Sequence, residues 1–234
     1  MAQLPRAPLS PLLAGEQQLS RELGGYLVKV LRLRAGDAFT LFDPEAGTEA
    51  DAELVRDIPA VVNVGEPREA ARVTRREVVL LQGFAKGDKP EQVLRAAVAL
   101  GASTVVFLRT ERSVAGAELR YERLHAVMLD VARQCGRGDL PALTGLLELK
   151  DALPAARGLL LQLDPAAPES LIEVLRQAPR DRAITLAVGP EGGFAAEESA
   201  QLSAAGFVAV RLAPFVLRTE LAAVAALSVV AAHE

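Results

Sequence analysis

The sequence is poor in the residues that build metal centres, disulfides and membrane spans. It has one cysteine, two histidines and no tryptophan, and aromatic residues make up 4% of it. The single Cys135 excludes an internal disulfide, and His125 and His233 are too few for a metal cluster, which argues against a metalloenzyme and a Ser-His-Asp hydrolase. The longest apolar run, Leu221 to Ala232, is too short to cross a bilayer, and the N-terminus lacks the layout of a signal peptide. We expect a soluble, cytoplasmic protein that binds no metal and no membrane.

The chain does have enough apolar residues for a large core, and its charge is unevenly distributed. Half of its 234 residues are hydrophobic, and its formal net charge is -4. Residues 73–140 are nonetheless net positive, which makes their cations candidates for phosphate contacts. These candidates are Lys86, Lys89, Arg109, Arg112, Arg133 and Arg137, together with Arg32 and Arg34 of a basic helical segment. The alternative for each is a solvated cation on the face of a helix.

The pattern of the chain changes near residue 72. Before it, strand-like segments at 38–42, 51–55 and 60–64 are separated by turn signals, which predicts a small β-barrel. The polar stretch 65–76 is the candidate boundary. After it, strands alternate with helices, which predicts a mainly parallel sheet covered by helices on both faces. We therefore expect an α/β chain with two domains, residues 1–72 and residues 73–234.

Capping residues and breakers place the elements of the second part. Asp88 is positioned to cap a helix that runs through Leu100, with Pro90 in its first turn. Thr219 is positioned to cap the last helix, which is apolar nearly all round and therefore packs in the core or against another subunit. Strands are expected at 78–81, 105–108, 158–163, 184–188 and 207–212, and further helices at 117–134, 168–177 and 196–205.

A glycine-rich turn follows the most completely apolar strand. Residues 184–188 read ITLAV and run into GPEGG at 189–193. Glycines let a ligand approach the backbone, and Pro190 stiffens the turn. A phosphate-binding loop would add a Lys and a Ser or Thr, whereas the charged residue here is Glu191, so we expect a cationic or neutral ligand. A purely structural turn is the alternative.

Two further turns follow predicted strands, at 163–165 (LDP) and at 212–220 (LAPFVLRTE). In a parallel sheet the loops at the carboxyl ends of the strands meet at one edge, and ligands bind there. The turns after residues 163, 188 and 212 are therefore expected to meet around one ligand.

As an ordered set, the motifs KGDK, LG, TERSV, QCGR, GPEGG and LxPxxLRTE resemble one family. The chain is similar to the bacterial ribosomal RNA methyltransferases of the SPOUT class that modify N3 of a uridine in the small-subunit RNA. VLRLRAGD and LFD are similar to the PUA-like RNA-binding barrel of that family. The resemblance spans nearly the whole chain. It implies a C-terminal trefoil knot, S-adenosylmethionine as cofactor, ribosomal RNA as partner and a homodimer formed through the knotted domain.

The resemblance also implies the roles of particular residues. It places the cofactor among Leu163, Gly189, Pro190, Glu191, Gly192, Gly193, Leu212, Pro214, Leu217 and Arg218. Methyl transfer to N3 requires alignment and removal of a proton. Arg218 is the candidate stabiliser of the uracil anion, and Glu191 or Glu220 is the candidate to orient the base or accept the proton. An ion pair between Arg218 and Glu220 at the start of the helix is the alternative.

Two aromatic residues and several departures from the family pattern complete the set of hypotheses. Phe194 and Phe215 are candidates to stack a flipped base, with burial beside the core as the alternative. The family usually has histidines just before VLR, where this chain has Tyr26 and its neighbours, and a glutamate before LG, where this chain has Ala99. In the last motif this chain departs from the family pattern at Ala213, Phe215 and Leu221. These departures favour a second hypothesis, an RNA-binding or ribosome-assembly protein of the same fold with weakened or lost catalysis. A third, an NAD- or ATP-binding enzyme, is disfavoured because no GxGxxG or lysine-containing loop is present.

Overall fold

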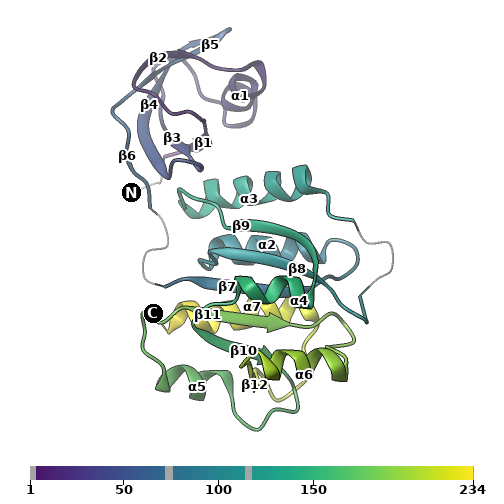
Figure 1. The fold of residues 1–234 in the computed structure, drawn as a ribbon. Helices are drawn as coiled ribbons and strands as arrows, with labels where there is room; N and C mark the ends of the chain where they lie inside the picture. The colour runs from purple at the N-terminus through teal and green to yellow at the C-terminus, as the bar shows by residue number, and fades with distance from the viewer. Residues whose placement is uncertain (1–3, 72–75, 114–117, 234) are drawn as a thin grey trace. The chain divides into compact units, whose positions relative to one another are not determined.

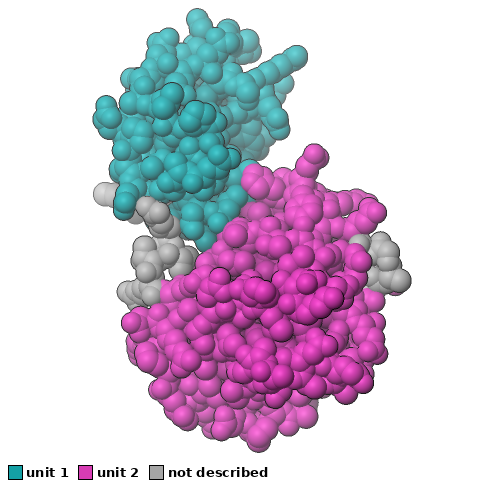
Figure 2. All heavy atoms as spheres, in the orientation of Figure 1, with its two compact units in different colours: residues 1–72, 129–140 teal, residues 73–128, 141–234 magenta. Residues whose placement is uncertain are grey.

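The computed structural model describes residues 4–71, 76–113 and 118–233 of the chain (Figure 1). The chain divides into two compact units, residues 1–72 with 129–140 and residues 73–128 with 141–234 (Figure 2). The predicted boundary between residues 72 and 73 and the predicted helix start at Ala117 lie outside the described residues. Within the described ranges, no helix is both long enough and apolar enough to cross a membrane.

The first unit is built on a mostly antiparallel sheet. Its strands follow the order β1 (Arg6–Pro8), β3 (Ala38–Asp43), β4 (Thr48–Asp57), β5 (Ala60–Val64) and β2 (Gly15–Gln18), and β6 (Arg68–Glu69) pairs with β4. Alternate residues of β4 are buried, as expected for a strand with one face on a core. A short helix α1 (Arg21–Gly25) continues into the π-helical turn η1 (Tyr26–Val30), whose Leu27 is fully buried in the same core.

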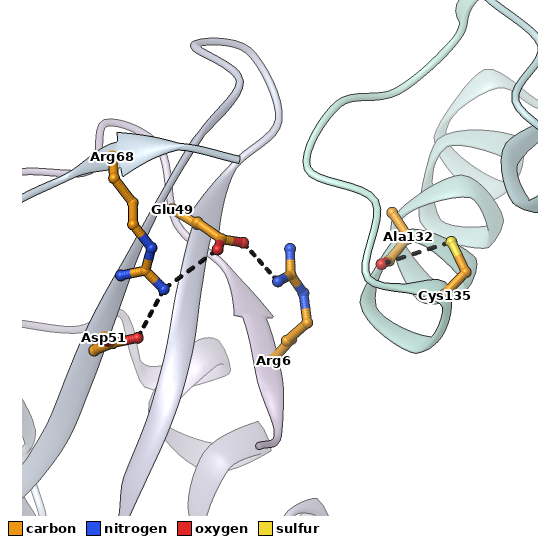
Figure 3. A network of polar contacts seen from close by, with 6 residues as sticks. All are labelled: Arg6, Glu49, Asp51, Arg68, Ala132 and Cys135. Carbon is orange, nitrogen blue, oxygen red and sulfur yellow. Dashed lines mark hydrogen bonds and ion pairs between the residues drawn. The ribbon is translucent and has the colours of Figure 1, made fainter. Parts of the chain in front are cut away.

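A polar network ties three strands of this unit together (Figure 3). On β1, Arg6 Nη1 donates to Glu49 Oε2 at 2.7 Å. The other oxygen of Glu49 lies 3.3 Å from Arg68 Nη2, which also donates to Asp51 at 2.9 Å. The Arg6 side chain is only 8% exposed. Removing one partner of the buried Arg6–Glu49 pair is strongly destabilising, so this pair holds β1 against β4. The half-exposed Arg68 adds a weaker link between β6 and β4.

The second unit contains the predicted parallel sheet, which confirms the α/β fold class. Its order is β12 (Val208–Val210), β10 (Leu159–Leu163), β11 (Ile184–Val188), β7 (Val78–Gly83), β8 (Thr104–Arg109) and β9 (Ala142–Glu148). The chain runs outward from β7 to β9 and then returns to the opposite side of β7. The reversal between β7 and β11 creates a topological switch point, where open α/β sheets bind ligands.

Helices cover both faces of this sheet (Figure 1). On one face, α7 (Thr219–Ala232) packs against β7 and β11 and against α2 (Lys89–Ala99) and α5 (Leu171–Gln177). On the other, Val79, Leu81 and Ala187 form a core with Leu149 of α4 (Leu149–Ala152) and Leu202 of α6 (Ala196–Ala204). The remaining elements are α3 (Tyr121–Cys135) and the 3-10 turn η2 (Leu153–Ala155). Successive strand residues point to opposite faces, so a near-continuous apolar run supplies both cores.

The structure corrects several predicted details. Strand β9, which contains Gly145, was not predicted, nor were β1 and β2. Asp88 is at the N-cap of α2, but its carboxylate accepts from the Gln92 side chain rather than from the helix backbone. Thr219 is not the cap of α7, because Arg218 is at the N-cap and Thr219 is the first helical residue. The Thr219 hydroxyl has a different partner, described below.

Candidate functional site

Three loops at the carboxyl ends of neighbouring strands line one cavity. They follow β10, β11 and β12, which are adjacent in the sheet. The cavity is lined by the predicted residues Leu163, Gly189, Pro190, Glu191, Gly193, Leu212 and Leu217. It is also lined by Asp164, Pro165, Val188, Ala213, Phe215, Val216, Thr219 and Ala222. The described lining does not include Gly192, Pro214 and Arg218, which belong to the same loops. The expected meeting of the three turns is therefore present.

The GPEGG loop is folded so tightly that glycine is required within it. The N–H of Gly193 donates to the Pro190 carbonyl at 2.8 Å, and Gly193 has a φ of 70°, which favours glycine. A Cβ added to Gly189 would lie 2.9 Å from the Cα of Gly193. A Cβ added to Gly83, at the end of β7, would lie 2.4 Å from the Pro190 nitrogen. The loop is therefore pressed against both β7 and its own end.

A buried hydrogen-bond chain connects this loop to β7 and to the last helix. Gln82 Nε2 on β7 donates to Thr219 Oγ1 at 2.8 Å, and the Thr219 hydroxyl donates to the Gly189 carbonyl at 2.6 Å. Gln82 is 1% exposed and Thr219 is 4% exposed. Because water does not reach these groups, a bond that is lost here leaves a buried polar atom unsatisfied. The threonine of the LRTE motif thus clamps the glycine-rich loop.

We expect Thr219→Val to destabilise the folded protein by about 1–3 kcal/mol. Valine preserves the shape of the side chain but removes the group that bonds both the Gly189 carbonyl and the Gln82 amide. Urea unfolding measures the effect. The matched control is Ser228→Ala on the same helix. The Ser228 hydroxyl is exposed and bonds to the carbonyl of Val224 on its own helix, so its loss should change stability by less than about 0.5 kcal/mol. Equal stability of Thr219→Val and the parent protein would contradict the clamp.

The loop that follows β8 supports the GPEGG loop from outside. Arg112 Nη1 donates to the Gly192 carbonyl at 2.6 Å. Glu198 of α6 accepts from the N–H of Ala195 at 2.8 Å and from the N–H of Glu111 at 2.8 Å. The TERSV segment therefore has a structural role beside the cavity. Arg112, a predicted phosphate contact, directs its guanidinium to a carbonyl of the loop.

Glu191 lines the cavity and pairs with a cation from α2. Lys89 Nζ donates to Glu191 Oε1 at 2.5 Å. Burial alone would raise the pKa of Glu191, but the hydrogen bond from Lys89, backbone hydrogen bonds and the lysine charge lower this pKa below its usual value. A carboxylate with a lowered pKa is a weak proton acceptor near neutral pH. Glu191 is therefore suited to contact a cation rather than to act as a base.

The two charged residues of the LRTE motif lie in different environments. Arg218 is exposed at the start of α7, next to the cavity-lining Leu217. Glu220 is 6% exposed, and its Oε2 has no hydrogen-bond partner among the described residues. An exposed guanidinium and a buried carboxylate do not favour the ion pair that was the alternative for these residues. Arg218 is thus an exposed cation between Leu217 and Thr219, which both line the cavity.

The predicted phosphate-binding cations divide into two groups. Arg137 is 6% exposed and donates to both carboxylate oxygens of Asp139, at 2.8 and 3.0 Å. Arg133 donates to Asp130 at 2.6 Å, and its guanidinium carbon lies 4.4 Å from the centroid of the Tyr26 ring. Arg137 is therefore not part of the RNA surface proposed below. Exposed cations of the predicted set are Arg32, Arg34, Lys86, Arg109 and Arg112, and of these Arg112 bonds the Gly192 carbonyl.

The two aromatic candidates and Gln82 differ in how well the sequence predicted them. Phe194 is partly buried against the core, which is the alternative considered for it. Phe215 is 81% exposed and lines the cavity. The role of Gln82 was missed, although a single amide at the end of the apolar run VVLLQG is the signal that could have shown it.

No group of three or more His, Cys, Asp or Glu side chains in the described ranges could hold a metal ion.

Comparison with known proteins identifies the family. A model described as an RNA methyltransferase domain matches residues 73–231, and one described as an RNA methyltransferase PUA domain matches residues 19–58. The ribosomal RNA small subunit methyltransferase E of Mycobacterium tuberculosis is 32% identical over 226 residues, which cover 88% of this chain and 82% of that protein.

Two solved structures are similar over nearly their whole length. A Legionella pneumophila protein, described as a methyltransferase in complex with bound S-adenosylmethionine, is 30% identical, with a TM-score of 0.85 and coverage of 99% of this chain and 98% of that chain. The ribosomal RNA small subunit methyltransferase E from Neisseria gonorrhoeae, bound to S-adenosylmethionine, is 27% identical, with a TM-score of 0.84 and coverage of 97% and 96%. With a family model matched over residues 73–231 and a relative that is 32% identical over 88% of the chain, this chain belongs to the RNA methyltransferase family.

Proposed function

We propose that the protein uses S-adenosylmethionine to methylate N3 of a uridine in small-subunit ribosomal RNA. The observation that carries this proposal is the single cavity formed by the loops after β10, β11 and β12. It occurs in a chain similar along its length to two proteins solved with S-adenosylmethionine. The relatives named as small subunit methyltransferases support the choice of RNA. A cytoplasmic location follows from that choice of substrate and is part of the proposal.

The residues that line the cavity fit this cofactor. Apolar side chains such as Leu163, Leu212 and Leu217 suit the adenine ring, and backbone groups of the glycine-rich loop can bond its polar edge. A Cβ added to Gly193 would meet no atom within 4 Å, so the backbone there is open to a ligand. Glu191 provides a carboxylate for a cationic group. The bound cofactor would supply an electrophilic methyl group, and the chain would supply position and charge.

The cavity is small, which suggests that exposed side chains beside it also contact the ligand. Its enclosed volume is about 100 Å³, which is smaller than pockets that bury most of a drug-sized ligand. A nucleoside-sized ligand would therefore extend past Phe215 and Val216, which are 81% and 78% exposed. Contact with a ligand or a second subunit would cover these apolar side chains.

We assign Arg218 to contact the uracil base during methyl transfer. Uracil N3 carries a proton, and an anion forms on the base as this proton leaves. An exposed guanidinium beside the cavity can stabilise that anion when the base binds over the cavity. Glu191 is less suited to accept the proton because its pKa is lowered. Glu220 is buried, and one of its oxygens has no hydrogen-bond partner in the described part of the chain; it is retained as the carboxylate that orients the base or accepts its proton.

The proposal extends to the domains and the assembly. We propose that residues 1–72 form a PUA-like RNA-binding domain and that residues 73–234 form a SPOUT domain with a C-terminal trefoil knot. Arg32, Arg34, Lys86 and Arg109 are proposed phosphate contacts, so RNA affinity should fall as salt rises.

We also propose a homodimer, because Phe215, Val216 and Leu221 expose an apolar surface near the start of α7. A monomer in sedimentation at micromolar concentration would count against it.

The decisive experiment combines cofactor titration with methyl transfer. Calorimetry of the purified protein with S-adenosylmethionine should show binding. Labelled methyl should then enter either small subunits or naked small-subunit RNA from cells that lack the gene, and mass mapping should locate it on N3 of one uridine. Cofactor and RNA binding without turnover would instead support a protein that has lost catalysis, the hypothesis favoured by Tyr26, Ala99, Phe215 and Leu221. Absence of cofactor binding would overturn both.

A further inference from the structure

The ion pair between Lys89 and Glu191 lies at the edge of the cavity after β10, β11 and β12. Glu191 lines this cavity, and its Oε1 accepts from Lys89 Nζ at 2.5 Å. The pKa of Glu191 is below its usual value, so the carboxylate is ionised near neutral pH. The two side chains are 25% and 42% exposed. A pair this open to water contributes little to folding stability, so its place beside a ligand cavity indicates another role.

The backbone of the GPEGG loop is fixed by groups other than this lysine. The Thr219 hydroxyl donates to the Gly189 carbonyl at 2.6 Å, and Arg112 Nη1 donates to the Gly192 carbonyl at 2.6 Å. Lys89 instead bonds to a side-chain carboxylate of the loop. The ion pair therefore acts mainly on the charge that the loop presents to the cavity, and much less on the path of the loop.

The stability of α2 does not account for a lysine at this position. Lys89 is the first residue of the helix, where the positive end of the helix dipole disfavours a cation. Pro90 and Glu91 follow it and suit the first turn, and Glu91 also pairs with Arg123. A cation is thus present at the end of α2 that favours it least, and its partner is the carboxylate that lines the cavity.

We propose that Lys89 determines how the cavity discriminates between the charged methyl donor and the neutral product. S-adenosylmethionine is positively charged at sulfur, whereas S-adenosylhomocysteine, which remains after transfer, is a neutral thioether. An unpaired Glu191 would attract that positive charge. Because the charge is lost during transfer, the carboxylate would stabilise the bound donor more than the transition state and would slow the reaction. Lys89 offsets this attraction. The inference rests on the proposed function, which makes S-adenosylmethionine the methyl donor.

Calorimetry of the full-length protein without RNA tests this role, with S-adenosylmethionine and S-adenosylhomocysteine titrated separately. Lys89→Met keeps an unbranched side chain but removes the charge. It should bind the donor about three- to fivefold more tightly and the product with nearly the parent affinity. Raised salt should shrink this gain, because both side chains are partly exposed. Lys89→Arg keeps the charge and should keep the parent ratio of affinities. The control Lys150→Met removes an exposed cation of α4 and should also keep it.

A double variant separates the charge of the lysine from its shape. Lys89→Met combined with Glu191→Gln removes both charges, so the ratio of donor to product affinity should return to that of the parent protein. In steady-state methyl transfer, Lys89→Met should lower kcat and the KM for the donor together, since it stabilises the bound donor.

An unchanged ratio of affinities in Lys89→Met would overturn the proposal. Equal weakening of both ligands would show that Lys89 only supports the loop. Equal tightening would show that Glu191 faces a part of the ligand that donor and product share. Failure of the proposed function is seen separately, as absent methyl transfer to small-subunit RNA by the parent protein, and does not affect a ratio measured without RNA.

Discussion

Gly83→Ala should weaken binding of S-adenosylmethionine by about 10- to 100-fold, which corresponds to about 1.4–2.8 kcal/mol. The new Cβ would lie 2.4 Å from the Pro190 nitrogen and 2.8 Å from the Gly189 carbonyl carbon. These are backbone atoms of the loop that lines the cavity, so they cannot move aside as the end of a flexible side chain would. The loop must shift away from β7, at an overpacking cost of about 1–3 kcal/mol. Titration calorimetry measures the lost affinity directly.

A matched glycine provides the control for this substitution. Gly25→Ala adds the same Cβ to helical backbone with no atom within 4 Å, and cofactor affinity should remain that of the parent protein. Urea unfolding of both variants establishes that they are folded during the titration. Unchanged cofactor affinity in folded Gly83→Ala would show that the GPEGG loop does not hold the cofactor in the position inferred here.

Arg218→Ala should lower the turnover number by about 100- to 1,000-fold, with a much smaller effect on cofactor affinity. The guanidinium is exposed at the start of α7, whereas the lining residues of the same loop are Leu212, Leu217 and their neighbours. A charge that acts only as the anion forms on the base affects the transition state more than the bound ground state. Single-turnover methyl transfer to small subunits, together with calorimetry of the cofactor, separates the two effects.

Arg218→Lys is the conservative variant for this test. Lysine keeps the positive charge but lacks the planar fork of donors, so it should restore part of the lost turnover. Unchanged turnover in Arg218→Ala would remove Arg218 from the mechanism. An equal loss of cofactor affinity and turnover would assign it to cofactor binding, in contrast to the role proposed above.

Periodicity and turn chemistry predicted the architecture of the second unit well. The apolar run ITLAV coincides with β11, and Pro190 with its flanking glycines ends that strand as expected. Strand β9 was not predicted because its residues are only partly buried and Gly145 interrupts them. In the first unit, β1 and β2 have three and four residues. Pairing with strands distant in sequence defines such short strands, and local pattern does not reveal it.

The candidate site was predictable to the level of loops but not of contacts. Gly-rich and Pro-containing turns after three strands indicate a shared edge, because parallel strands bring their carboxyl ends together. The assignment of Thr219 as a helix cap failed because local sequence rules take no account of a carbonyl 30 residues earlier in the chain. Arg137 was predicted from charge alone, and its pairing with Asp139 depends on burial that a sequence does not state. The motifs of the family resemblance supplied the cofactor and the substrate, which physical patterns did not specify.

The bond between Gln82 and Thr219 joins residues 137 positions apart, and this separation affects how the protein matures on the ribosome. Synthesis proceeds from the N-terminus, and early segments fold first. The glycine-rich loop leaves the ribosome before the threonine that fixes it, so a nascent chain cannot complete the clamp until the start of α7 has also left the ribosome. Competence to bind the cofactor should therefore arise only after Thr219 has been synthesised, and chains that stop before Thr219 should lack it.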